Sequence, residues 1–185
     1  AASDVYKRQL IYKYIYIIFL MKSDIIVIGG GHAGCEAAAA AARIGVKTIL
    51  ITHKFETIGQ MSCNPAIGGV GKSHLVKEID AADGIMARCA DRAAIHLKVL
   101  NSSKGPAVRA TRAQADRELY KKSVQKELKT LENLEIVEGE VTDFGIQNNQ
   151  IGSVTVGKCE ILKAQKVILT TGTFLNGKLF TGMDN

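Results

Sequence analysis

Residues 24–34, DIIVIGGGHAG, join a short continuous apolar run to a glycine-rich segment. An apolar run of this length is typical of a buried parallel strand. The alanine-rich residues 32–44 follow and predict a helix, with Gly45 where a helix C-terminal glycine belongs. Residues 46–52, VKTILIT, predict a second strand. The order strand, helix, strand predicts a β-α-β unit with a right-handed crossover.

The segment GGGHAG fits the dinucleotide-binding pattern G-x-G-x-x-G, with a strand before it and a helix after it. In this pattern Gly29 permits the tight turn, Gly31 lets the backbone approach a pyrophosphate, and Gly34 lets the helix pack closely on the strand. The helix N-terminus then supplies N–H donors for phosphates. His32 is interpreted as a local backbone-capping residue rather than a catalyst. The alternative is a glycine-rich turn without a ligand.

The end of the second strand departs from this pattern. A carboxylate is expected there to bind a ribose hydroxyl. The sequence has Thr52-His53-Lys54, and Glu56 is the nearest acid. The ribose is therefore bound by Thr52, by Glu56 or by neither, and a simple nicotinamide-dependent dehydrogenase is disfavoured.

A second glycine-rich stretch, PAIGGVGKS at residues 65–73, resembles a nucleoside-triphosphate loop. That loop requires G-x-x-x-x-G-K-[ST] directly after a buried strand. Ala66 stands where the first glycine is required, and Pro65 cannot donate to a strand ladder. The stretch is therefore not predicted to bind ATP or GTP.

The composition predicts one α/β domain in a reducing cytoplasm. The chain has 185 residues, 46% hydrophobic content, a net charge of +6 and four widely spaced cysteines. A disulfide framework or metal-type cysteine spacing is not indicated. Residues 10–20, LIYKYIYIIFL, are apolar but too short for a membrane span. We interpret Met21 as the natural start and residues 1–20 as a non-native lead; a short membrane-targeting segment is the alternative.

Cys63 lies in the segment GQMSCNP, just after the β-α-β unit. A cysteine becomes nucleophilic when backbone N–H groups or cations stabilise its thiolate, and Lys72 or His74 would be such cations. A small buried side chain is an equally good interpretation of Cys63. Cys35 and Cys159 are interpreted as core residues, and the interpretation of Cys89 is left open.

The rest of the chain predicts further helices and strands. Helices are predicted at residues 72–82, 85–91 and 112–131, a strand at 95–99 and a loop at 101–109. Short strands are predicted at 134–137, 141–146, 151–156, 159–162 and 167–170, with a hairpin turn at 148–150. Four basic residues either contact phosphates or form a solvated helix face, and the helix face is favoured: Lys104, Arg109, Arg112 and Arg117.

Four longer runs carry a resemblance to a known family: IVIGGGHAGCEAAAAAARIG, THKFETIGQMSCNPAIGGVGKSHLVKEIDAADG, LNSSKGPAVRATRAQADR and LTTGTFLNGKLFTG. They resemble the N-terminus of the MnmG (GidA) enzymes, which are FAD-dependent tRNA uridine 5-carboxymethylaminomethyl modification enzymes. The resemblance covers Met21 to Asn185, and the absent carboxylate after the second strand is also a trait of the family. It implies that residues 21–185 are the N-terminal part of an FAD/NAD(P)-binding domain.

The implied fold is a truncated glutathione-reductase-like FAD domain, with a Rossmann-type parallel sheet and a small additional antiparallel β element. The resemblance implies an FAD pyrophosphate site at Gly29, Gly30, Gly31, His32, Ala33 and Gly34. It implies further flavin contacts at Val141, Thr171, Gly172 and Thr173. Residues 65–73 would lie along the flavin, and Cys63 would be catalytic.

The implied reaction adds a carboxymethylaminomethyl group to C5 of the wobble uridine 34 of tRNA. Methylenetetrahydrofolate supplies the carbon, glycine or ammonium the amine, and NADH reduces the flavin. A GTPase of the MnmE type is the implied partner, and the full-length enzyme is expected to be a homodimer away from membranes. The chain is expected to be inactive alone, since it resembles an N-terminal fragment.

Other functions remain open on the sequence. One is a folate- and FAD-dependent tRNA uridine methyltransferase, which usually has an acid after the second strand and lacks MSCNPAIGG. Another is an FAD-dependent oxidoreductase of small molecules, and a third is a module that binds a nucleotide without turnover.

Overall fold

The computed structural model describes residues 22–173 and residue 175. The interpretation of residues 1–20 as a lead therefore lies outside the described residues. Within the described part, no helix is both long enough and apolar enough to cross a membrane.

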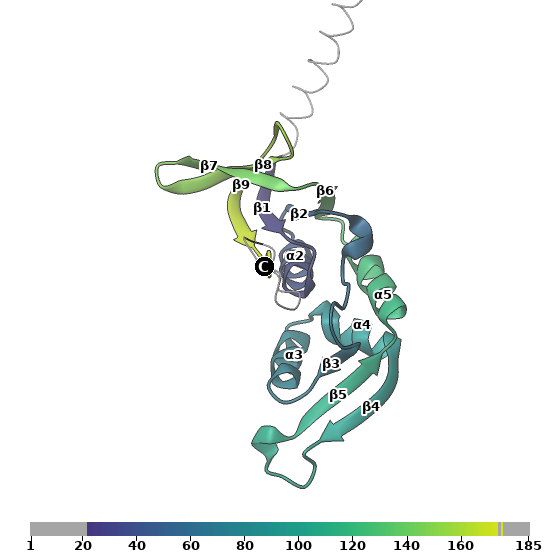
Figure 1. The fold of residues 1–185 in the computed structure, drawn as a ribbon. Helices are drawn as coiled ribbons and strands as arrows, with labels where there is room; N and C mark the ends of the chain where they lie inside the picture. The colour runs from purple at the N-terminus through teal and green to yellow at the C-terminus, as the bar shows by residue number, and fades with distance from the viewer. Residues whose placement is uncertain (1–21, 174, 176–185) are drawn as a thin grey trace, which may run out of the picture.

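The predicted β-α-β unit is confirmed and forms the centre of the molecule (Figure 1). Strand β1 (Lys22–Ile28) leads into helix α2 (His32–Arg43), and strand β2 (Thr48–Thr52) lies parallel to β1. Strand β6 (Leu134–Glu138) adds to β2 and strand β9 (Glu160–Leu169) adds to β1, both in parallel. The sheet order is β6-β2-β1-β9-β8-β7. Strand β1 therefore has β2 as its neighbour on one side and β9 on the other.

An antiparallel meander of strands β7 (Val141–Gln147), β8 (Gln150–Val156) and β9 completes this sheet. The predicted hairpin turn is confirmed at Asn148 and Asn149, which adopt positive φ angles of 51° and 59°. The two short strands predicted at 159–162 and 167–170 are instead the single strand β9. It stays continuous because its first residues pair with β8 and its later residues pair with β1.

Alternate residues of β1 and β2 enter two separate cores, because successive side chains of a strand point to opposite faces. Val27 and Leu50 pack with α2, α4 and α5. Ile26, Ile28, Ile49 and Ile51 pack with the meander strands β8 and β9. The parallel sheet is thus covered by helices on one face and by strands on the other.

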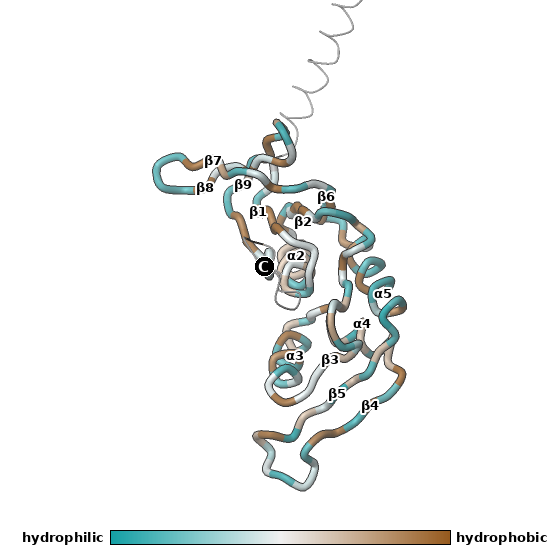
Figure 2. Tube along the Cα trace, in the orientation of Figure 1, coloured by the Kyte–Doolittle hydropathy of each residue, from teal (hydrophilic) through white to brown (hydrophobic). Residues whose placement is uncertain are grey.

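A second, antiparallel sheet has the order β3-β5-β4 and extends away from the first in Figure 1. It consists of β3 (Ala66–Gly68), β4 (Ala94–Leu100) and β5 (Ala110–Ala115). Helices α3 (Lys72–Ala81) and α4 (Ile85–Ala93) precede β4, close to their predicted positions. Short 3-10 turns, η1 (Phe55–Thr57) and η2 (Pro106–Val108), lie in the connecting loops. Figure 2 shows hydrophobic and hydrophilic positions alternating along β4 and β5.

The helix predicted at residues 112–131 is wrong in its first part. Residues 110–115 form β5, and helix α5 covers Arg117–Lys129. Asp116 is the N-cap of this helix: its Oδ1 accepts a hydrogen bond of 2.8 Å from the N–H of Leu119. The strand forms because Ala113 pairs with both Ile67 and Leu97, which are distant in sequence.

Candidate dinucleotide-binding site

The glycine loop at residues 29–34 connects β1 to α2. Two of its glycines are required because neighbouring backbone atoms leave no room for a side chain. Gly29 has a φ of 110°, and a Cβ there would lie 2.5 Å from the carbonyl oxygen of Thr170. A Cβ on Gly34 would lie 1.8 Å from the carbonyl oxygen of Gly29. No side chain fits at either position. The predicted roles of both glycines, in the turn and in helix packing, are therefore confirmed.

Gly31 differs from these two glycines. Its φ is −74°, which any residue adopts, and a Cβ there would meet no atom of the chain within 4 Å. It is also the N-cap of α2, where no side chain caps the helix. The backbone N–H groups of the first helical turn therefore have no side-chain capping partner. Open space above a helix N-terminus suits a phosphate group that approaches the backbone closely.

The interpretation of His32 as a capping residue is wrong, since the side chain makes no cap hydrogen bond. Its ring instead stacks on Tyr120 of α5, with the ring centroids 5.6 Å apart. Burial lowers the pKa of His32, and the positive charge of Lys72 lowers this pKa further. The imidazole is therefore neutral near pH 7, and its Nε2 is buried without a hydrogen-bond partner.

The ends of the neighbouring strands border the loop. Thr52, at the end of β2, is buried, and a Cβ on Gly30 would lie 2.6 Å from its Oγ1. Glu56 lies on the exposed turn η1. A third candidate was missed in the sequence: Glu138 ends β6 beside Thr52, and its carboxylate accepts a hydrogen bond from the N–H of Phe55. Parallel pairing of β2 with β6 supplies this carboxylate from a distant part of the chain.

Residues 171–173 follow β9 at the same edge of the sheet as the glycine loop. Thr170 fixes this arrangement: its Oγ1 donates a hydrogen bond to the carbonyl oxygen of Ile28 (2.8 Å) or of Gly29 (3.1 Å), and its N–H also bonds to Ile28 (2.9 Å). Gly172 has a positive φ of 61°. The structure thus brings Thr171, Gly172 and Thr173 close to the glycine loop, through a threonine that the sequence analysis did not identify.

Val141 begins β7, close to the end of β2. Two residues earlier, the N–H of Gly139 donates a hydrogen bond of 2.8 Å to the carbonyl oxygen of Thr52. The side chain of Val141 packs on the second core. The backbone of Val141 therefore lies close to the end of β2, while its side chain is partly buried.

The segment after β2 is attached to the site from two sides. The N–H of Gly59 donates to the carbonyl oxygen of Gly30 (3.3 Å). On the other side, the Gln125 side chain of α5 reaches the carbonyl oxygens of Phe55, Glu56 and Ile58, at 3.2 to 3.3 Å. The segment that follows β2 is therefore held against the glycine loop on its way to Cys63.

Cys63 is exposed, in a loop between buried Met61 and strand β3. The guanidinium of Arg117 donates a hydrogen bond to the backbone carbonyl oxygen of Cys63. Lys72, which was considered as the activating cation, donates instead to the carbonyl oxygen of Ala66 (3.4 Å). Arg117 is therefore the cationic side chain that contacts the Cys63 residue.

The other three cysteines divide differently from the prediction. Cys35 is buried as expected; burial raises the pKa of its thiol to about 12, and its Sγ lies 3.4 Å from the carbonyl oxygen of Gly30. Cys89, which was left open, is also buried. The interpretation of Cys159 as a core residue is wrong: it is exposed in the β8–β9 turn, one residue before β9 begins.

The second glycine-rich stretch has a different setting. Its strand β3 is short and antiparallel, and it belongs to the second sheet. A Cβ on Gly68 would lie 2.1 Å from the carbonyl oxygen of Thr111, while Gly69 and Gly71 have φ angles of 107° and 82°. The backbone itself therefore explains these glycines. A nucleoside-triphosphate loop follows a buried parallel strand, which this stretch lacks.

Comparison with known proteins identifies the family. Residues 24–185 match the model of the family described as Glucose inhibited division protein A (GIDA). The chain belongs to the GidA family. The form II crystal structure of Aquifex aeolicus GidA is 48% identical, with a TM-score of 0.82, over 85% of this chain and 26% of that chain. The form I structure is 49% identical, with a TM-score of 0.81, over 84% of this chain and 26% of that chain.

A more distant match concerns the fold alone. The structure of pqsL, a probable FAD-dependent monooxygenase from Pseudomonas aeruginosa, has a TM-score of 0.58 at 14% identity, over 79% of this chain and 41% of that chain. The predicted fold class, a Rossmann-type parallel sheet with a small antiparallel element, is confirmed. The resemblance to the GidA family is also confirmed, and the chain spans 26% of the length of the two Aquifex structures.

Proposed function

We propose that this chain forms the FAD-binding part of an FAD-dependent tRNA-modifying enzyme. The observation that carries the proposal is the position of Gly31: it is the N-cap of the helix that follows β1, and its open surroundings leave room for a ligand at the N-terminus of this helix. Membership of the GidA family supports a flavin over other dinucleotides. The same membership favours this enzyme over the methyltransferase and small-molecule oxidoreductase alternatives.

In this proposal each part of the site has a separate role. The N–H groups at the start of α2 bind the pyrophosphate, with Gly31 as the point of closest approach. The backbone of Val141 contacts the adenosine end, near Thr52 and Glu138. Residues 171–173 contact the cofactor from the β9 side of the loop. Bound FAD would supply two-electron redox chemistry, while the chain's own residues bind and orient it.

The finer activity is also a proposal. The enzyme would add a carboxymethylaminomethyl group to C5 of the wobble uridine of tRNA, with methylenetetrahydrofolate and NADH as co-substrates. It would act in the cytoplasm as a homodimer with an MnmE-type GTPase. The setting of residues 65–73 supports the assignment of GTP hydrolysis to the partner, because this stretch lacks the surroundings of a nucleoside-triphosphate loop.

Cys63 is the proposed catalytic thiol. Its exposure suits a side chain that reacts with substrate. It lies in the segment that follows β2 and contacts the glycine loop through Gly59. Arg117 would position this segment through the Cys63 carbonyl group.

The proposal is tested by titrating FAD into the chain and into the variant Gly31→Val, with ATP as a competitor. The side chain of valine fills the open space above the helix N-terminus, so FAD affinity should fall at least about tenfold, as for the loss of a main ligand contact. Circular dichroism should remain unchanged, because a Cβ at Gly31 meets no protein atom.

Gly152→Val is the matched control. Gly152 also has open surroundings, but it lies on β8 away from the loop. This variant should bind FAD as the wild type does. Equal FAD affinity of wild type and Gly31→Val would contradict the proposed site, and tight ATP binding without FAD binding would contradict the choice of flavin.

A further inference from the structure

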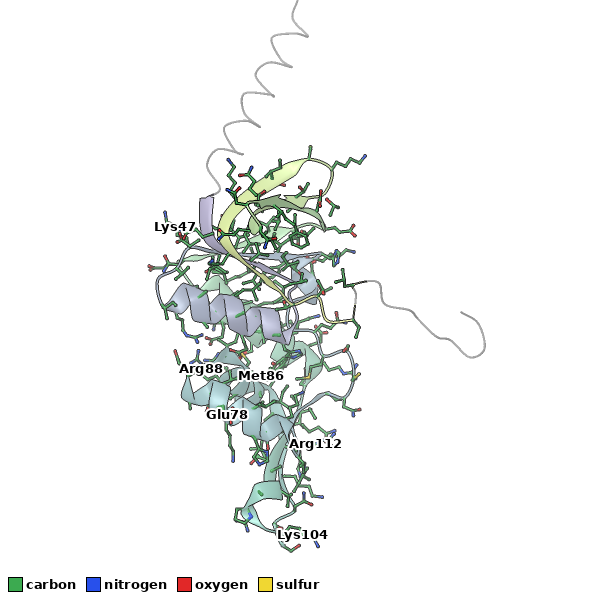
Figure 3. The ribbon with its side chains drawn as sticks, turned by 90° about the vertical axis from the view of Figure 1, so that its left-hand side faces the viewer. Lys47, Glu78, Met86, Arg88, Lys104 and Arg112 are labelled. Carbon is green, nitrogen blue, oxygen red and sulfur yellow. The ribbon has the colours of Figure 1, made fainter. Side chains whose placement is uncertain are left out.

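We propose that the hairpin of β4 and β5, with its connecting loop, is an arm that binds the phosphate backbone of RNA. This inference rests on the proposed function, because it assigns a surface to the tRNA substrate. We call residues 94–115 the arm. Figure 3 shows the arm with Lys104 at its far tip and Arg112 nearer its base.

The register of the arm places two cations directly opposite each other. Lys98 on β4 pairs with Arg112 on β5, so their side chains share one face. Both residues are exposed. Like charges directly opposite on neighbouring strands are destabilising unless an anion lies between them. The pair therefore costs stability in the isolated arm and is favourable when a phosphate binds.

The sequence around the pair contains no compensating acid. From Arg92 to Ala115 the chain has no Asp or Glu. Arg92 itself is paired with Glu127 of α5. Over the part of the chain that the structure describes, no salt bridge involves the four cations of the arm: Lys98, Lys104, Arg109 and Arg112.

The tip of the arm is held by its own hydrogen bonds. The guanidinium of Arg109 donates to the carbonyl oxygen of Ser102 (3.0 Å), and the side-chain amide of Asn101 donates to that of Val108 (3.0 Å). Asn101 also has a positive φ of 53°. The loop is thus closed, and less side-chain entropy is lost when Arg109 meets an anion.

The two faces of the arm are chemically different. Ile95, Leu97 and Val99 alternate with the charged positions and are 71%, 59% and 51% exposed. Leu97 pairs with Ala113, so this apolar face lies opposite to the Lys98–Arg112 face. Phosphates interact with the charged face only. The RNA backbone is therefore assigned to the side that carries Lys98 and Arg112.

The charged face continues toward the candidate catalytic thiol. Across the sheet, Arg112 pairs with Gly68 and Gln114 pairs with Ala66, which lies three residues after Cys63. At the end of β5, the N–H of Ala115 donates to the carbonyl oxygen of Pro65 (2.8 Å). An RNA strand bound along the arm is thereby directed to the segment that carries Cys63. Phosphate contacts of this kind position a nucleic acid without reading its sequence.

The test measures binding of fluorescently labelled tRNA to the full chain by anisotropy, at several salt concentrations. The variant Lys98→Ala/Arg112→Ala removes the opposed pair. Each lost phosphate contact lowers the slope of log affinity against log salt by about 0.7 to 0.9. The double variant should therefore lose roughly 1.4 to 1.8 from this slope, and about tenfold in affinity near 0.1 M salt.

The matched control is Lys122→Ala/Lys126→Ala, which removes the same charge from exposed positions of α5. It should leave both the slope and the affinity nearly unchanged. An equal loss of tRNA affinity in the two double variants would contradict the proposed role of the arm, since binding would then depend on net charge alone. An unchanged slope in Lys98→Ala/Arg112→Ala would overturn it as well.

Three further outcomes are informative: the first tests the RNA assignment, and the other two separate this inference from the proposed function. If polyglutamate displaces tRNA as effectively as unlabelled tRNA does, the arm recognises any polyanion and the RNA assignment is wrong. If the chain binds FAD but no tRNA at low salt, the arm is overturned while the flavin site stands. If Gly31→Val loses FAD and Lys98→Ala/Arg112→Ala loses only tRNA, both are supported independently.

Discussion

Two glycine-rich loops, at residues 29–34 and 68–71, each lead into a helix, but their glycines are required for different reasons. In the second loop, Gly69 and Gly71 have open surroundings and left-handed φ angles of 107° and 82°. In the first loop, Gly31 has open surroundings and an ordinary φ of −74°. Backbone conformation therefore explains the glycines of the second loop but not Gly31, for which we propose a ligand. The comparison shows that a glycine-rich sequence before a helix does not by itself indicate a ligand loop, because the φ angles of the glycines and the preceding strand must also be considered.

The largest expected effect concerns the close packing in the first loop. Gly34→Val places a Cβ 1.8 Å from a backbone oxygen that cannot move without breaking the β1–α2 connection. We expect a loss of about 4 kcal/mol or more in the free energy of unfolding, as for severe overpacking at a strained site. Urea unfolding monitored by circular dichroism measures this loss. Stability within about 0.5 kcal/mol of the wild type would contradict the packing role.

A smaller effect is expected in the second loop. The variants Gly69→Ala and Gly71→Ala each put a Cβ on a left-handed residue, which costs about 1 to 2 kcal/mol. This loop is expected to lie along the flavin and not to bind the nucleotide phosphates, so FAD affinity corrected for the folded fraction should fall by less than the roughly tenfold expected for Gly31→Val. Unfolding curves and flavin titrations on the same samples check both statements. A loss of FAD affinity as large as that of Gly31→Val, at full stability, would remove the distinction between the loops.

The smallest expected effect is the pH dependence caused by His32 in the first loop. Burial lowers the pKa of His32 below 6.5, so the unfolded chain binds this proton more tightly than the folded chain does. The stabilisation is therefore complete above pH 6.5 and is lost as the pH falls through the interval between the unfolded and folded pKa values.

The variant His32→Gln removes this titration, and His96→Gln, at an exposed position of β4, is the control. Unfolding free energies between about pH 5 and 7.5 should show a weaker pH dependence in His32→Gln than in the wild type. His96→Gln should keep the wild-type dependence. Equal slopes in all three proteins would show that His32 does not titrate differently on folding.

The sequence alone determined the β-α-β unit, its glycine loop, the rejection of residues 65–73 as a nucleoside-triphosphate site, and the family. These features depend on short-range patterns: apolar periodicity, glycine spacing and the position of a proline. Thr171, Gly172 and Thr173 were identified through family resemblance, and the structure places them close to the glycine loop through Thr170.

Only the tertiary structure decided how distant segments meet. Glu138 reaches the end of β2 because β6 pairs with it, and Thr170 bonds to Gly29 because β9 adds to β1. Residues 110–115 are a strand because β3 and β4 flank them, and this pairing sets Arg112 opposite Lys98. Such contacts join residues far apart in the chain. A local sequence pattern carries no information about the partner strand. Hydrogen bonding across the sheet, rather than intrinsic propensity, therefore determines which segments are strands and which residues lie opposite each other.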